Sequence, residues 1–179
     1  MTEQNISLTI DGQAVTVPKE TTILEAARSV GIDIPTLCWA ENLTPVNVCR
    51  LCVVEADNSK ALVPACSRAC DAGSNIETSN ERVTKNRRMV LELLDSVNDL
   101  SQSEELQDLM PNYEADRSRY SDNLAAHDEP KVEDDLFIRA YDRCVLCYKC
   151  VQACGEEAQF TFAIAIANRG FDARVSTEH

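Results

Sequence analysis

The alternation of apolar and polar residues at the start of the chain predicts a β-hairpin. Apolar side chains occupy every second position over residues 6–10, and the pair Asp11-Gly12 is typical of a two-residue turn. Residues 14–17 return as the second strand. Pro18 ends this strand because proline has no N–H to donate to a neighbouring strand.

A helix is expected next, over residues 22–30 (TILEAARSV). Thr21 or Thr22 can cap its start, and Glu25 completes a capping box if Thr22 is the cap. Gly31 stands where a helix C-terminal glycine belongs. A hairpin followed by a helix across its face predicts a small α+β domain.

The spacing of apolar residues changes further along the chain, first to that of strands and then to that of a helix. Residues 52–56 and 60–66 are typical of two short strands joined by a turn, and apolar residues return at helical spacing from about Arg82. From Ser96 to Asp135 the sequence is polar and acidic, and two prolines interrupt it. We interpret this stretch as a loosely packed helical connector with a short helix near residues 103–110. Apolar, strand-like sequence returns near the end of the chain.

Size and charge narrow the possible functions. At 179 residues the chain fits one medium domain or two small ones, and it can bury a core without disulfides. Its formal net charge of −13 disfavours nucleic acid as a partner, because phosphate contacts need clustered Lys and Arg. No apolar run approaches the roughly 20 residues of a membrane span, and the first residues lack a signal-peptide pattern. The chain has nine cysteines, and we therefore expect a cytoplasmic protein whose clustered cysteines bind metal rather than form disulfides.

Four cysteines form the first candidate metal site: Cys38, Cys49, Cys52 and Cys66, with ten, two and thirteen residues between them. Four thiolates can hold zinc, but zinc ribbons usually bring two C-x-x-C pairs and this set has one. A single pair in a long loop, with one cysteine on each side, favours a [2Fe–2S] cluster in which two thiolates bind each iron. The loop should also supply N–H groups to the cluster sulfides. Cys70 lies outside the pattern, and we interpret it as a small, partly buried apolar residue.

The second candidate site is the run Cys144, Cys147, Cys150 and Cys154. This C-x2-C-x2-C-x3-C spacing is that of bacterial ferredoxins, in which the first three cysteines bind one [4Fe–4S] cluster and the fourth binds a second cluster. Gly155 replaces the proline that usually follows, which is a backbone preference and not a ligand. No second run is present in the sequence. Cys154 is therefore expected either to bind a second cube or to be the fourth ligand of the first.

The first cysteine set, preceded by GIDIPTLC and containing CRLCVVE, resembles the N-terminal [2Fe–2S] domain of a particular family group. That group includes the large subunit of bacterial respiratory NADH dehydrogenase, iron hydrogenases and the alpha subunit of NAD-dependent formate dehydrogenase. The tail FTFAIAIANRGFDARVS after the second set is similar to the segment between the two cubane motifs of the formate dehydrogenase alpha subunit. The resemblance covers essentially the whole chain.

The resemblance implies an α+β fold in three parts. A β-grasp-like [2Fe–2S] ferredoxin domain is expected over residues 1–80, a helical connector over 81–135, and a [4Fe–4S] bacterial-ferredoxin-like unit over 136–179. The chain is expected to stop, by truncation, just before a second cubane motif.

One cluster site of the family is missing from this sequence. The family binds it with one histidine and three cysteines ahead of an ELQDL-like helix. Here ELQDL stands at residues 105–109, and the preceding LELLDSVNDLSQSE contains neither histidine nor cysteine. His127 and His179 lie too far along the chain to substitute, and we interpret His127 as a solvated residue of the acidic linker.

The function that the resemblance implies is electron transfer within an NAD-dependent formate dehydrogenase. The chain would relay electrons between a molybdopterin site and a subunit that binds flavin and NAD. Those cofactors are expected on the rest of the natural chain or on partner subunits, because the sequence has no G-x-G-x-x-G after a strand and no catalytic pair. Within the class, the alternative is an iron–sulfur subunit of an NAD-linked hydrogenase or an NADH dehydrogenase. From another class, the alternative is a zinc-stabilised scaffold without a redox role.

Overall fold

The computed structural model describes residues 4–120, 130–132 and 135–177. The chain divides into two compact units. One comprises Met1–Trp39 and Pro45–Arg87, and the other comprises Ala40–Thr44 and Arg88–His179. None of the described helices is long and apolar enough to cross a membrane.

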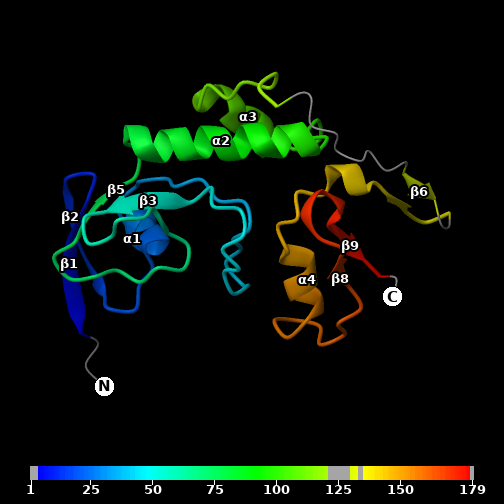
Figure 1. Ribbon diagram of the computed structural model, residues 1–179. Helices are drawn as coiled ribbons and strands as arrows, with labels where there is room; N and C mark the ends of the chain where they lie inside the picture. The colour runs from blue at the N-terminus through cyan, green and yellow to red at the C-terminus, as the bar shows by residue number, and fades with distance from the viewer. Residues whose placement is uncertain (1–3, 121–129, 133–134, 178–179) are drawn as a thin grey trace. The chain divides into compact units, whose positions relative to one another are not determined.

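The first unit is built on a five-stranded mixed sheet. Its strands are β1 (Asn5–Ile10), β2 (Gln13–Pro18), β3 (Val53–Ala56), β4 (Val63–Pro64) and β5 (Asn75–Glu77), and their order is β2-β1-β5-β3-β4 (Figure 1). β1 and β2 pair in an antiparallel register from Asn5↔Pro18 to Ile10↔Gln13, which confirms the predicted hairpin. The central strand β5 runs parallel to β1 and antiparallel to β3. The sequence did not predict β5, because three residues with a single apolar side chain carry no period.

Helix α1 (Ile23–Ser29) lies against this sheet (Figure 1). The Glu25 N–H donates to the Thr22 hydroxyl, and the Glu25 carboxylate accepts from the Thr22 N–H at 2.8 Å. The predicted capping box is therefore confirmed, with Thr22 as the cap. After the C-cap at Val30, Gly31 has φ +78°, a conformation that favours glycine. The apolar face of α1 is buried against the side chains of β1 and β2.

The core of the first unit reaches the cysteine loop. Ile10, Leu24 and Ile76 are almost completely buried, and Cys52 and Cys66 belong to the same cluster of buried residues. Burial of apolar side chains removes their surface from water and is the main stabilising contribution to such a unit. The core therefore holds the segments that carry these two cysteines.

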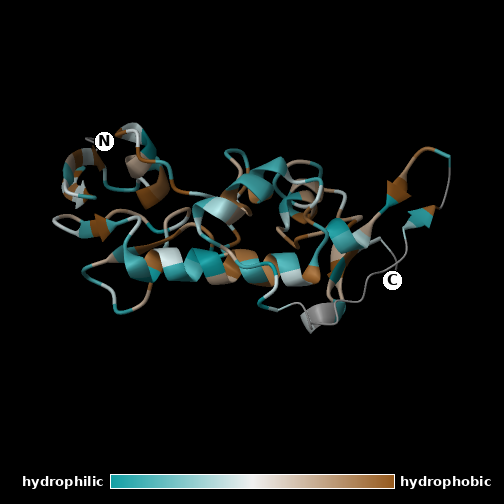
Figure 2. Cartoon of the chain, turned by 90° about the horizontal axis from the view of Figure 1, so that it is seen from above, coloured by the Kyte–Doolittle hydropathy of each residue, from teal (hydrophilic) through white to brown (hydrophobic). Residues whose placement is uncertain are grey.

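Helix α2 (Glu81–Val97) contributes its first turns to the first unit and its remaining turns to the second. Hydrophilic and hydrophobic residues are both spread along it (Figure 2). In the second unit, a small group of side chains is buried: Leu91, Leu100, Leu106 and Met110. The buried Glu92 carboxylate accepts from Arg119 at 2.9 Å and from the N–H of Asp116 at 3.2 Å. These contacts hold the segment after α3 against α2.

Helix α3 (Glu104–Asn112) confirms the short helix expected in the connector. The Ser103 hydroxyl caps its start by accepting from the N–H of Leu106. Pro111, one of the two prolines that interrupt the polar stretch, lies in the last turn of α3, and the helix ends one residue later. A proline in the last turn removes one helical hydrogen bond and stops further extension. His127 lies outside the described residues.

The C-terminal part consists of short elements around the second cysteine run. They are β6 (Lys131–Val132), β7 (Ile138–Arg139), η1 (Tyr141–Arg143), α4 (Lys149–Cys154), β8 (Ala165–Ala167), η2 (Gly170–Asp172) and β9 (Arg174–Ser176). β8 and β9 form an antiparallel pair with Ile166 opposite Val175. The strand-like segment expected near the end of the chain is therefore present.

Candidate metal centres

The loop between Cys38 and Cys52 has an unusual backbone. Asn47 has φ +59° and Arg50 has φ +57°, a region that non-glycine residues seldom adopt because it is strained. Alternation of right- and left-handed residues turns successive N–H groups toward one side of the chain, which creates a concave site for anions. Backbone strain is therefore concentrated beside the thiols, as is common at functional sites.

Backbone N–H groups of this loop reach the cysteine sulfurs. The N–H of Leu51 donates to Sγ of Cys49 at 3.5 Å. The N–H groups of Val48 and Cys49 act to lower the pKa of Cys38, and those of Ala65 and Cys66, after the loop, help to lower the pKa of Cys52. Such donors favour the thiolate over the neutral thiol. The loop thus supplies N–H groups to the sulfurs; donation to cluster sulfides stays a prediction.

The four cysteines lie in two hydrogen-bonded pairs. A hydrogen bond from Cys38 lowers the pKa of Cys49 to about 5, and one from Cys66 lowers the pKa of Cys52 to about 7. The donors show the opposite shift: the pKa of Cys38 and that of Cys66 are raised, first by the hydrogen bond and then by burial. Negative charge on Cys38 and Cys49 also contributes to the shift at Cys66, so the two pairs lie close together.

The pairing fits the donor set that a two-iron core needs. Thiolates are the ligands of [2Fe–2S] clusters, and each iron takes two of them. Three of the four thiols are buried and Cys49 is half-buried, so the site is shielded but opens to solvent at Cys49. Within the described residues, no group of three or more His, Cys, Asp or Glu side chains could hold a single metal ion. The ligand assignment itself stays a prediction.

Cys70 is placed differently. It is 4 % exposed, and burial raises its pKa to about 11, with the nearby carboxylates of Asp71 and Glu25 adding to the shift. It belongs to the apolar core of the first unit. This placement is that of a small core side chain with an unreactive thiol.

The second cysteine run, like the first, has residues with positive φ between its cysteines. Leu146, between Cys144 and Cys147, has φ +51°, and Tyr148, between Cys147 and Cys150, has φ +67°. Left-handed residues between the cysteines curve the chain and direct N–H groups to one side. The pKa of Cys150 is raised by burial and then by the negative charges of Cys144 and Cys147. We call Cys144, Cys147 and Cys150 the trio.

Cys154 makes contacts of its own. Its sulfur lies 3.0 Å from the Thr161 hydroxyl, and the N–H of Ala163 donates to it at 3.1 Å. These hydrogen bonds, the one to Thr161 first, lower the pKa of Cys154. The fourth cysteine of the run thus has hydrogen-bond partners of its own.

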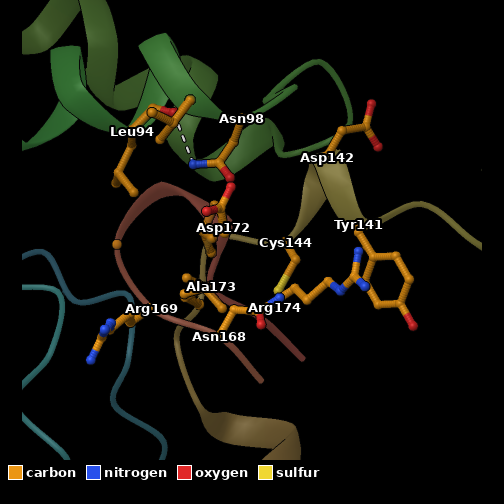
Figure 3. Close-up of a pocket in the computed structure, with 14 residues that line it drawn as sticks. Leu94, Asn98, Tyr141, Asp142, Cys144, Asn168, Arg169, Asp172, Ala173 and Arg174 are labelled. Carbon is orange, nitrogen blue, oxygen red and sulfur yellow. Dashed lines mark hydrogen bonds between the residues drawn. The ribbon is translucent and has the colours of Figure 1, made fainter. Parts of the chain in front are cut away.

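Cys144 also lines a cavity of about 730 Å³ within the second unit. Figure 3 shows its sulfur among the surrounding side chains, with Tyr141 and Arg174 nearby. The Arg174 guanidinium lies 5.7 Å from the centre of the Tyr141 ring. On the α2 side, the Asn98 amide donates to the carbonyl of Leu94 at 3.0 Å. Cys144 and the two residues after it face the cavity, whereas Cys147 and Cys150 are not among its lining residues.

Comparison with known proteins supports the first site directly. Residues 3–81 match the family model of the 2Fe-2S iron-sulfur cluster binding domain. This stretch contains both thiol pairs and the sheet that carries them. The chain thus has a mixed α+β fold with an N-terminal [2Fe–2S] ferredoxin domain.

Three curated relatives match nearly the whole chain. The alpha subunit of NADPH-Fe(3+) oxidoreductase from Geobacter sulfurreducens is 36 % identical over 92 % of this chain. The HndD subunit of the NADP-reducing hydrogenase from Solidesulfovibrio fructosivorans is 34 % identical over 96 %, and a subunit of NADH-quinone oxidoreductase from Rhizobium meliloti is 31 % identical over 96 %. The match spans only 20 % to 31 % of these relatives' lengths.

Among solved structures, one of an NAD+-reducing [NiFe]-hydrogenase in the H2-reduced state matches with a TM-score of 0.81 and 28 % identity. The match covers 95 % of this chain and 74 % of that chain. The chain is therefore homologous to subunits of NADPH-Fe(3+) oxidoreductase, hydrogenase and NADH-quinone oxidoreductase, and its structure resembles a hydrogenase subunit. None of these comparisons singles out formate dehydrogenase.

Three residues at the sites are not apparent as functional candidates from the sequence pattern: Asn47, which contacts Cys66; Thr161, which contacts Cys154; and Arg87, which contacts the Cys52 segment. Asn47 is recognisable in the sequence only as a turn former. For Arg87 a signal exists, because it lies midway between Val83 and Leu91 at a spacing of four. A basic residue at a position where the helical spacing predicts a buried apolar side chain is unusual, and this marks Arg87 as a candidate.

Proposed function

We propose that the chain is an iron–sulfur electron-transfer module of an NAD(P)-linked oxidoreductase complex. The observation that carries the proposal is the meeting of two thiol pairs inside a domain that matches [2Fe–2S] proteins. The relatives' names add support, since each is a subunit of an oxidoreductase or hydrogenase that uses NADPH, NADP or NADH.

In the first unit, Cys38 and Cys49 would bind one iron, and Cys52 and Cys66 would bind the other. When bound, a [2Fe–2S] cluster accepts and releases one electron at a time. The N–H groups of the loop would then stabilise the negative charge of the sulfurs, and the surrounding core would exclude water from three of the four ligands. A zinc scaffold remains the alternative from another class, and metal analysis separates the two.

In the second unit, the trio would provide three ligands of a [4Fe–4S] cluster. Cys154, whose sulfur contacts Thr161 and the N–H of Ala163, would bind a second cube, as the fourth cysteine of such a run does in two-cluster ferredoxins. This assignment agrees with the bacterial-ferredoxin spacing of the run. The second unit is therefore proposed to be ferredoxin-like over residues 136–179.

The complex is proposed to be an NAD-dependent formate dehydrogenase. Support comes from the resemblance of the tail after Cys154 to that family's alpha subunit. Molybdopterin, flavin and NAD would then be bound outside these residues, by the rest of the natural chain or by partner subunits. Hydrogenase and NADH dehydrogenase fit the three relatives and the solved structure equally well. Nine free cysteines suit a reducing compartment such as the cytoplasm.

Reduction by different donors tests this proposal. The anaerobically purified chain is mixed in turn with formate, H2 and NADH, and the visible absorbance of the clusters is followed. No donor should bleach the chain alone. After addition of a flavin-binding partner subunit, NADH should bleach the clusters, and formate should do so only with a pterin-bearing partner. If H2 bleaches the clusters with a hydrogenase partner and formate does not, the complex is a hydrogenase and not a formate dehydrogenase. Turnover of any donor by the isolated chain would refute the electron-transfer function.

A further inference from the structure

The buried face of α2 contains one cation. Val83, Arg87 and Leu91 follow one another at a spacing of four, which places them on the same face of the helix. Val83 and Leu91 are fully buried, and Arg87 is only 2 % exposed. Arginine is almost never this buried unless its guanidinium has partners.

The guanidinium of Arg87 binds the backbone on both sides of Cys52. Nε donates to the carbonyl of Leu51 at 3.1 Å, and Nη2 donates to the carbonyl of Val53 at 3.0 Å. These are residues immediately before and after Cys52, and all of them lie in the first unit. The planar, rigid fork of arginine makes two such contacts at once, which fixes the path of the chain through Cys52.

Packing alone does not explain a cation at this position. Moving a charge out of water is costly, and a well-packed apolar side chain in its place is often neutral or stabilising. A long apolar residue would continue the stripe formed by Val83 and Leu91. The positive charge is thus retained next to a segment whose cysteine is predicted to bind iron.

We propose that Arg87 is a positioning residue that also sets the reduction potential of the [2Fe–2S] cluster. It braces the Cys52 segment through the two carbonyls, and its charge stabilises the electron that the cluster gains on reduction. This inference rests on the proposed function of the first site. It adds to that function a residue on α2 that controls how readily the site accepts an electron.

The direction and size of the effect follow from electrostatics. A cation favours the more negative, reduced state, so its removal must lower the midpoint potential. Two unit charges about 10 Å apart, at an effective dielectric constant of about 20, change an equilibrium constant by roughly tenfold. For a one-electron couple, a tenfold change corresponds to about 59 mV.

Three variants of the full 179-residue chain separate charge from bracing. Arg87→Met removes both, Arg87→Lys keeps the charge but not the fork, and Arg82→Met is the control. Arg82 lies on the same helix, but its side chain is 48 % exposed and pairs with Glu55. Each protein is analysed for iron and sulfide, and its midpoint potential is measured by titration followed by electron paramagnetic resonance.

Arg87→Met should retain the cluster with a reduced-to-oxidised ratio about tenfold lower at fixed potential. Arg87→Lys should stay within about threefold of the wild type but lose iron to a chelator several times faster. Arg82→Met should match the wild type in both measurements. A fully loaded Arg87→Met variant with the wild-type potential would overturn the inference. If Arg87→Met assembles no cluster, Arg87→Lys decides, and a wild-type rate of iron loss in that variant would overturn it.

The outcome is separable from the fate of the proposed function. If the wild-type chain contains no iron and sulfide, the function fails and the potential has no meaning. If the wild type contains a full cluster and Arg87→Met has the same midpoint potential, the proposed function stands and only the role of Arg87 fails.

Discussion

Sγ of Cys66 lies 3.3 Å from the side-chain oxygen of Asn47, which lies nineteen residues earlier in the chain. The Ser67 hydroxyl donates to the same oxygen at 2.7 Å. Asn47 thereby joins the strained loop to the segment that follows β4. With iron bound, Cys66 is a thiolate and accepts hydrogen bonds, and the amide of asparagine can rotate to donate its N–H instead.

We expect replacement of Asn47 to lower the potential of the two-iron cluster, because hydrogen bonds to ligand sulfurs stabilise the reduced state. Asn47→Gly removes the amide while glycine accepts the φ of +59° without strain. Asn47→Leu removes the amide and adds strain. Both variants should shift the midpoint downward by a similar amount, while Asn47→Leu alone should also lose iron faster. A potential unchanged in Asn47→Gly would show that the amide does not tune the cluster.

Cys49 and Cys70 form a matched pair for testing the ligand assignment. Cys49→Ser should abolish the rhombic resonance of the reduced two-iron cluster and leave signals from the second cysteine run intact. Cys70→Ser should leave both, because Cys70 is a core side chain with a raised pKa. Electron paramagnetic resonance of both reduced variants provides the measurement. Loss of the two-iron signal in Cys70→Ser would mean that the ligand set is misassigned.

The raised pKa of Cys70 predicts a specific pH dependence of stability. Its folded-state pKa of about 11 lies above the ordinary value of 9.0, so the neutral thiol is favoured by folding. The contribution is complete below pH 9 and is lost as the pH rises toward 11, up to about 3 kcal/mol, since each pKa unit is worth about 1.4 kcal/mol. Urea unfolding of the wild type and of Cys70→Ala should therefore converge between pH 8.5 and 11. Parallel pH profiles for the two proteins would contradict this prediction.

The second cysteine run should not hold a complete cube on its own. If Cys154 binds a different cluster from the trio, the trio offers three thiolates, and the 179-residue chain should contain a labile or three-iron species there. Cys154→Ser should then leave that species unchanged, whereas Cys147→Ser should abolish it. A chain continued through a second cysteine run should hold two cubes.

The contrary result is equally clear. A stable, stoichiometric [4Fe–4S] cluster in the 179-residue chain that disappears in Cys154→Ser would make Cys154 the fourth ligand. Mössbauer spectroscopy of iron-57-labelled protein distinguishes three-iron from four-iron clusters.

Local sequence patterns predicted individual elements, whereas the cysteine spacing predicted only which segments approach one another. The alternation around Asp11-Gly12 and the Thr22–Glu25 cap are local, and both elements formed as predicted. The thiol pairing of Cys52 with Cys66 could be predicted only as an approach of two segments, because a hairpin between them had to form first.

Other features depend on tertiary contacts that no local pattern records. β5 has one apolar residue, Ile76, and is a strand because β1 and β3 lie on either side of it. The hydrogen bonds of Arg87 and Asn47 likewise join segments far apart in the chain. Such long-range polar contacts, rather than the helices and strands, were the part of the sites that sequence reasoning did not supply.

Metal and sulfide analysis of the anaerobically purified intact chain tests whether the first site binds a two-iron cluster. The Cys147→Ser variant, in which the second run is impaired, isolates this contribution. We expect about two irons and two acid-labile sulfides per chain in that variant, a brown colour, and a rhombic resonance on reduction. One zinc per chain with negligible sulfide in a colourless protein would contradict it.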